Sequence, residues 1–261
     1  MFRLLILVAA ATLATACALA APGRAAAVTG TCGEGAYAYA GIGGHELVSG
    51  VSARIAPTAA PTVRDGHVDG WVGVGGSGAG PNGADEWIQI GLTSVPNEAL
   101  NSIYYEIVRP GHPDVTHWLR ANVHVGEQHT FAVREIAGRP SWWRVWLDGS
   151  PASPPVFLPS SHARWTAQAV GESWAGPTSG PCNTYAYSFG NVAFANARNG
   201  GWSPFHRVDS YQDANYQLVR QSPTSFLAHS AVTPQTRITA VTGSDRGDLP
   251  ATPISVVQPG P

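Results

Sequence analysis

Short runs of alternating apolar and polar residues, broken about every ten residues by glycine, proline or Asp-Gly pairs, extend through most of this chain. One run, 87–92, reads Trp-Ile-Gln-Ile-Gly-Leu, so Trp87 and Gln89 would share one face of a strand while Ile88 and Ile90 fill a core. No amphipathic helical period of useful length interrupts the pattern. We therefore predict an all-β protein, an antiparallel β-sandwich or jelly roll of ten or more strands.

The individual strands follow from these runs and from the turn residues between them. The predicted strands are 36–40, 51–55, 67–74, 87–92, 102–108, 119–125, 129–135, 142–147, 156–158, 165–174, 185–195 and 218–227. The first should be an edge strand. Gly126-Glu127 should join 119–125 to 129–135 as a hairpin, and Asp148-Gly149 marks a turn.

The N-terminus has the features of a targeting segment. Arg3 precedes an apolar run, 4–13, and small residues follow as far as Ala27. This order predicts a secretory signal peptide over 1–27, cleaved after Ala20 or Ala27. The protein should then be secreted and extracellular, with no membrane attachment after cleavage.

Composition divides the remainder of the chain into a domain and a tail. Residues 28–230 carry the strand pattern, and about 200 residues can bury an adequate core as one β-sandwich domain. The stretch 231–261 is rich in threonine and proline without periodicity, which predicts a disordered tail.

Charge and cysteine usage limit the partners and the compartment. The chain has no lysine, and loss of two arginines with the signal peptide would leave a net charge of about −4, which gives no electrostatic footprint for nucleic acid or anionic membranes. Cleavage would also remove Cys17 and leave Cys32 and Cys182, which we predict to form a disulfide. It would close a loop of about 150 residues, worth roughly 4–5 kcal/mol in the loop-entropy model.

Four acidic residues lie on predicted strands, namely Asp69, Glu86, Glu106 and Glu172. Glu106 and Glu172 are flanked by apolar and aromatic residues, where desolvation would raise the pKa of a carboxyl group and suit it to general acid or base chemistry. An outward carboxylate on a solvated sheet face fits the same pattern, so both interpretations stay open for each residue.

Other motifs do not support a cofactor or a metal. The run 73–78 matches a dinucleotide fingerprint as a string, but Pro81-Asn82-Gly83 follows where a helix should begin, so we interpret it as a turn. The remaining candidate ligands lack a recognised metal spacing and are interpreted as surface residues. They are His112, Asp114, His117, His124 and His129.

Several short motifs, taken in order, resemble those of the glutamic peptidases (eqolisins). They are 71–76, 87–91, 104–106, 165–172 and 189–194, within about half of the chain, 69–197. The resemblance implies a concanavalin A-like (lectin/glucanase-type) β-sandwich of two seven-stranded sheets. It also implies a secreted, acid-active endopeptidase with a Gln–Glu dyad, no metal and no cofactor.

In the family the glutamate activates a water molecule and later protonates the leaving amine, while the glutamine stabilises the oxyanion. Gln89 matches the glutamine. The family's Ala-Glu-Trp-Ile-Val-Glu pattern, registered on Trp165, puts Arg164 and Gln168 at its acids, whereas the distance to Phe189 favours Glu172, which we adopt.

A second departure concerns Gly75, which stands where the family has an aspartate. Three functions therefore compete. The first is an acid endopeptidase with Gln89 and Glu172 as the catalytic pair. Its substrate-binding residues would be Trp71, Trp87, Tyr104, Glu106 and Trp174.

The second hypothesis is a non-catalytic, lectin-like module that binds carbohydrate or peptide on the same aromatic face. The third is a glycoside hydrolase using Glu106 and Glu172, which would need carboxyl groups ~5–9.5 Å apart. In each case the partner is an extracellular polypeptide or polysaccharide, and we expect a monomer.

Overall fold

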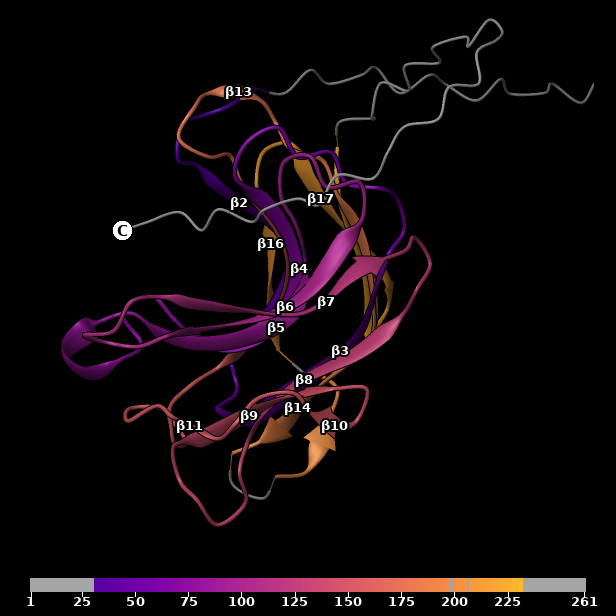
Figure 1. Ribbon diagram of the computed structural model, residues 1–261. Coiled ribbons are helices and arrows are strands. Elements are labelled where there is room, and N and C mark those ends of the chain that lie inside the picture. The colour runs from indigo at the N-terminus through magenta and orange to yellow at the C-terminus, as the bar shows by residue number, and fades with distance from the viewer. Residues whose placement is uncertain (1–30, 198–199, 206, 232–261) are drawn as a thin grey trace, which may run out of the picture.

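The computed structural model describes residues 31–197, 200–205 and 207–231. Within these ranges the chain is an antiparallel all-β sandwich in which two large sheets lie face to face (Figure 1). The predicted fold class is confirmed. The predicted signal peptide 1–27 and the tail from residue 232 onward lie outside the described residues.

One sheet has seven strands in the order β16-β2-β12-β4-β5-β6-β7. Their bounds are β2 Tyr37–Gly44, β4 His67–Gly76, β5 Glu86–Ser94, β6 Asn101–Val108, β7 Val115–Val123, β12 Ala167–Trp174 and β16 Val208–Gln212. A single 3₁₀ turn, η1 (Pro81–Gly83), precedes β5, and no α-helix occurs in the described ranges. The 73–78 run therefore leads into a turn, as predicted.

The second sheet has nine strands, not the seven that the resemblance implies, because two-residue strands β11 and β15 extend it beside β9 and β14. Its main order is β10-β9-β8-β3-β14-β18-β17. The bounds are β3 Val48–Pro57, β8 His129–Glu135, β9 Trp142–Leu147, β10 Ser150–Pro151, β11 Val156–Phe157, β14 Ala186–Asn196, β15 Trp202–Ser203, β17 Tyr216–Ser222 and β18 Ser225–Ser230.

The core lies between the two sheets and follows the side-chain alternation of each strand. On β5, Ile88, Ile90 and Leu92 are fully buried against the other sheet, as the sequence predicts. On β12, Gly171 lets the ring of Tyr185 approach closely, because a Cβ there would lie 2.5 Å from that ring. The polar and aromatic residues that alternate with these core residues therefore lie on the opposite face of the seven-stranded sheet.

A predicted hairpin between 119–125 and 129–135 is wrong. β7 pairs with β6 in one sheet and β8 pairs with β3 in the other, so the connection crosses between sheets. Gly126 donates its backbone N–H to Pro57 at the end of β3, which holds the crossing loop in place. The turn at Asp148-Gly149 is confirmed, with positive φ at both residues between β9 and β10.

Two further expectations need correction. The run 36–40 is not an edge strand, because β16, which the sequence pattern did not reveal, covers β2 on its outer side. The single final strand 218–227 is instead the hairpin of β17 and β18. Both errors arise in the polar C-terminal part of the domain, where strand alternation is weak.

The predicted disulfide is confirmed: Cys32 and Cys182 are bonded. They lie at a small two-stranded sheet formed by β1 (Thr31–Cys32) and β13 (Gly180–Pro181). The bridge ties the start of the domain to the loop after β12. No helix in the described ranges is long and apolar enough to cross a membrane.

Candidate functional site

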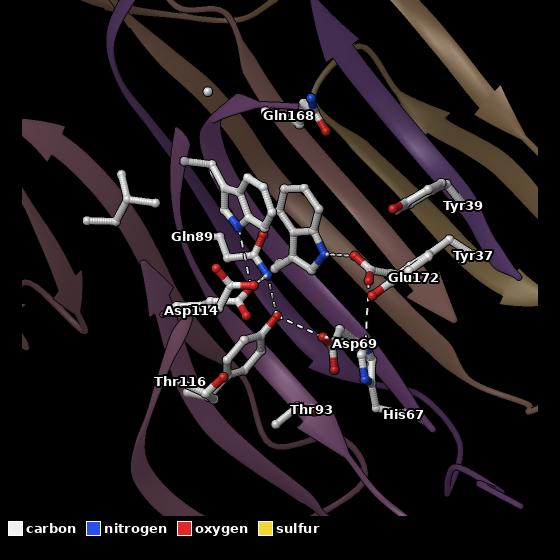
Figure 2. Close-up of a pocket in the computed structure, with 18 of the residues that line it drawn as sticks. Tyr37, Tyr39, His67, Asp69, Gln89, Thr93, Asp114, Thr116, Gln168 and Glu172 are labelled. Atoms are coloured by element: carbon white, nitrogen blue, oxygen red, sulfur yellow. Dashed lines mark hydrogen bonds and ion pairs between the residues drawn. The ribbon is translucent and has the colours of Figure 1, made fainter. Parts of the chain in front are cut away.

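A cleft of about 760 Å³ lies on the seven-stranded sheet, on the face turned away from the core. Its floor comes from β4, β5, β6 and β12 (Figure 2). On β4 the core side is taken by Val68, Gly70 and Val72, so the alternating residues His67, Asp69 and Trp71 face the cleft. On β5 the same rule turns Trp87 and Gln89 into it, as the sequence predicts.

Glu172 forms the first polar group of the cleft, together with two β4 side chains. It is 6% exposed and lies directly across from Asp69 in the β12–β4 register. The indole Nε1 of Trp71 donates to Glu172 Oε2 at 2.7 Å. The imidazole Nε2 of His67 lies 3.4 Å from Glu172 Oε1. The Glu172 carboxylate, whose environment the sequence left undecided, therefore faces the cleft and is nearly buried.

Gln89 forms the second group with residues of β5 and β6. Its Nε2 donates to the Tyr104 hydroxyl at 2.9 Å and to Glu106 Oε2 at 3.1 Å. Trp87 Nε1 donates to the same carboxylate oxygen at 3.3 Å. Four of the predicted site residues are thus brought together by hydrogen bonds.

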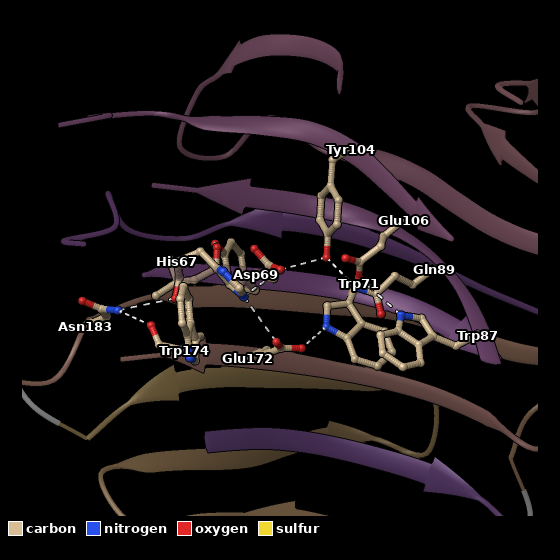
Figure 3. Close-up of polar contacts among 12 residues, drawn as sticks. His67, Asp69, Trp71, Trp87, Gln89, Tyr104, Glu106, Glu172, Trp174 and Asn183 are labelled. Carbon is tan, nitrogen blue, oxygen red and sulfur yellow. Dashed lines mark hydrogen bonds and ion pairs between the residues drawn. The ribbon is translucent and has the colours of Figure 1, made fainter. Parts of the chain in front are cut away.

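Tyr104 joins the two groups. Its hydroxyl accepts from Gln89 and donates to Asp69 Oδ2 at 2.9 Å (Figure 3). Tyr104 and Asp69 are both nearly buried, at 3% and 4% exposure. A continuous polar chain therefore runs across β5, β6 and β4 to the carboxylate that faces Glu172.

Gln89 and Glu172 share the cleft, but no hydrogen bond links them directly among the described contacts. The indole of Trp71 lies between them (Figure 3). Gln168 on β12 lies in the same row as Gln89, on the other side of β4, since both pair with Gly73. A Cβ at Gly73 would lie 2.9 Å from the Cβ of Gln89, so glycine keeps this row open.

The family pattern can also be read along β12 from its first residue. Read from Ala167, the Ala-Glu-Trp-Ile-Val-Glu pattern places Gln168 at its first acid and Glu172 at its second. Sequence analysis also adopted Glu172, from its distance to Phe189. The alternative anchor, Trp165, precedes the strand and packs in the core. Only the second acid of the pattern is thus an acid in this chain.

Burial and mutual charge shift the pKa values of the cleft's titratable groups. Burial raises the pKa of Asp69 to about 7; the charge of His67 lowers this pKa and that of Glu172 raises it. Burial opposes the imidazolium of His67, but Asp69 and Glu172 outweigh it and raise the pKa of His67 to about 9. Burial also raises the pKa of Glu106, partly offset by the Trp87 N–H.

Trp174, predicted to bind substrate, is not among the residues that line the cleft. Its ring packs against Tyr37 and His67, with centroids 6.2 and 5.5 Å apart. Sequence reasoning missed His67, although its place two residues before Asp69 on a predicted strand puts both on one face. It also missed Tyr37, 53% exposed, and Trp118, 56% exposed, which line the cleft.

The histidines set aside as surface residues are exposed or half-buried, except for His129, which is 8% exposed. His129 lies between Asp148, 2.7 Å from its Nδ1, and Glu127, 3.2 Å from its Nε2. These contacts, and not a metal spacing in the sequence, account for its burial.

Comparison with known proteins supports the fold. No protein-family model and no curated protein matches the chain. Among the solved structures that are similar, two each cover 74% of this chain and 97% of their own. One is scytalido-glutamic peptidase with a transition-state analogue inhibitor, at 16% identity and a TM-score of 0.55. The other is SCP-B, an eqolisin peptidase in complex with the tripeptide Ala-Ile-His, at 15% identity and a TM-score of 0.52. The chain therefore has the fold of the glutamic peptidases.

Proposed function

We propose that this chain, which has the fold of the glutamic peptidases, is a secreted acid endopeptidase that hydrolyses polypeptides in the cleft. The observation that carries the proposal is the placement of Glu172 and Gln89 in one cleft on the outer face of the sheet, each held by buried hydrogen-bond partners. The predicted disulfide, now confirmed, fits a secreted protein.

Glu172 acts as the general base. Its Oε2 is held by Trp71, and its Oε1, 3.4 Å from His67 Nε2, is the oxygen that a water molecule in the cleft would approach. The carboxylate takes a proton from the water as the water oxygen bonds to the peptide carbonyl carbon. The same proton passes to the leaving nitrogen as the carbon–nitrogen bond breaks. The products are a free carboxyl group and an amine.

Gln89 serves as the oxyanion donor. An uncharged amide can donate to a developing oxyanion without the desolvation cost of a cation. In the free protein the Gln89 amide already donates both of its N–H groups, one to Tyr104 and one to Glu106. The oxyanion would replace one of these acceptors, and the other bond would keep the amide in position. Because the Trp71 indole lies between Gln89 and Glu172, the scissile carbonyl would sit above that ring.

A non-catalytic binding module is the second candidate, favoured by one observation. Gln168 pairs with Gly73 on the side opposite to Gln89, and its side chain is an amide and not an acid. Two amides and the exposed rings of Tyr37 and Trp118 would hold an extended polymer by hydrogen bonds and stacking without cleaving it.

One assay separates the two functions. The mature protein is incubated with denatured casein at about pH 4, alongside Glu172→Gln, Gln89→Ala and the matched control Glu98→Gln. Glu98 is exposed and lies outside the cleft. Wild type and control should cleave casein at equal rates, and the two cleft variants should lose activity by roughly 10²–10⁴-fold.

Equal cleavage by all four proteins would refute the assigned pair. Absence of cleavage by any of them, with saturable quenching of tryptophan fluorescence by oligosaccharides or peptides, would favour the binding module. A pulldown on insoluble polysaccharide would then identify the polymer class.

A further inference from the structure

One imidazole and two carboxylates meet at one end of the cleft. His67 and Asp69 lie two residues apart on β4 and face the same side, and Glu172 lies across from Asp69 on β12. One ligand atom from each of the three lies within 4.8 Å of the others, and they form the only such group found in the described part of the chain. Two neighbouring strands therefore hold an imidazole and two carboxylates toward one point.

The contacts within this trio are ion pairs, but they are longer than charge-assisted hydrogen bonds. His67 Nε2 is 3.4 Å from Glu172 Oε1 and 3.6 Å from Asp69 Oδ2. Charge-assisted hydrogen bonds are about 2.7–2.9 Å long. The histidine pairs elsewhere in the chain are shorter, at 2.7 Å for His129–Asp148 and 2.9 Å for His162–Glu135.

The same spacing fits ligands around a small divalent ion. Zinc lies about 2.0–2.2 Å from nitrogen and carboxylate oxygen ligands, so two ligands of a tetrahedral zinc are about 3.3–3.6 Å apart. Both distances from His67 Nε2 fall in this range. An imidazole with two carboxylates and one position open to the cleft is a donor set that suits Zn²⁺.

A second observation concerns Asp69. Its Oδ1 atom is buried and accepts no hydrogen bond of good geometry within the described contacts, although the nearby Thr93 side chain partly stabilises the carboxylate, and the residue is only 4% exposed. A buried carboxylate oxygen without a partner is costly, and a cation would compensate it. A metal ion would displace the proton of His67, and the two ionised carboxylates would then carry a charge of −2, equal and opposite to that of a divalent ion.

Neighbouring side chains already orient the candidate ligands. Trp71 Nε1 binds Glu172 Oε2 at 2.7 Å and leaves Oε1 toward His67. The Tyr104 hydroxyl donates to Asp69 Oδ2 at 2.9 Å. Hydrogen bonds of this kind, from residues behind the ligands, are what fixes ligand geometry in metal sites.

We propose that His67, Asp69 and Glu172 form a binding site for one divalent transition-metal ion, and that Zn²⁺ fits it best. The site goes beyond the proposed peptidase and does not depend on it. Because Glu172 cannot act as a general base while it ligates a metal, bound zinc would inhibit the proposed hydrolysis, and chelation would restore it.

The test uses the full mature chain, stripped with EDTA and then dialysed. Isothermal titration with Zn²⁺ at neutral pH should show one ion per chain, and zinc should raise the Tm. The variants His67→Ala, Asp69→Asn and Glu172→Gln should each weaken zinc binding by at least about 10²-fold. Loss of a ligand should cost more than the 10–100-fold that is typical when a residue that only orients a ligand is replaced. The control His162→Ala removes a histidine paired with a carboxylate and should bind zinc like wild type.

Substitution with Co²⁺ provides a readout that a purely structural defect would not mimic. Wild type and the control should develop the visible absorption of tetrahedral cobalt, and the three ligand variants should not, while their circular dichroism remains that of a folded β-protein. Stoichiometric zinc binding that survives in all three variants, or no binding to wild type, would overturn the site. Loss of casein cleavage with zinc binding intact would instead count only against the peptidase.

Discussion

Tyr104→Phe removes the hydroxyl that joins the two polar groups of the cleft. The change breaks one hydrogen bond to the Asp69 carboxylate and one from the Gln89 amide, both 2.9 Å long. A bond to a charged group contributes about 1.5–3 kcal/mol and a neutral one about 0.5–1.5 kcal/mol. Because both partners are nearly buried, water cannot replace the hydroxyl easily. We expect the free energy of unfolding to fall by about 2–4 kcal/mol.

Urea unfolding at about pH 8, in EDTA, measures this loss, because Asp69, with a pKa of about 7, is then ionised. Tyr105→Phe is the matched control. Its ring belongs to the same strand, and its hydroxyl has no hydrogen bond among the described contacts, so its loss should stay within about 0.5 kcal/mol. Equal losses for the two variants, or a loss below about 1 kcal/mol for Tyr104→Phe, would refute the continuous polar chain.

The remaining predictions concern the disulfide, the packing between the two sheets and an exposed aromatic ring that lines the cleft. Replacing Cys32 and Cys182 by serine should lower the free energy of unfolding by up to about 5 kcal/mol, since the bridge spans 150 residues; a urea midpoint unchanged from wild type would contradict this. Gly171→Ala should destabilise by about 1–3 kcal/mol in thermal unfolding, because the new Cβ would lie 2.5 Å from the Tyr185 ring; equal Tm values would show that the sheets yield. Trp118→Ala should leave the Tm unchanged, since the ring is 56% exposed, but raise KM for casein at constant kcat; an unaltered KM would remove this ring from substrate binding.

The sequence was sufficient for the parts of the fold that alternation determines. On β5, a strict period of two placed Gln89 on the outer face and Ile90 in the core, and the structure agrees. Prediction from the sequence failed where a strand pairs with another strand far away in the chain. The Gly126-Glu127 turn has hairpin chemistry, yet the next strand pairs with β3, far earlier in the chain.

The candidate site was only partly predictable for the same reason. Composition around Glu172 indicated an unusual carboxylate, but only the strand register shows that it pairs with Asp69 and that Gln168 and Gln89 lie on either side of Gly73. Local sequence carries no information on cross-strand register. The part played by His67 therefore depends on contacts that the sequence did not show.

The most direct test of the proposed chemistry is kcat/KM on a single fluorogenic peptide at about pH 4, in EDTA, for wild type and Glu172→Gln. The substitution keeps the shape of the side chain and the hydrogen bond that it accepts from Trp71 while removing the base. The account predicts a loss of roughly 10²–10⁴-fold, mostly in kcat. Equal kcat/KM values for the two proteins would contradict it.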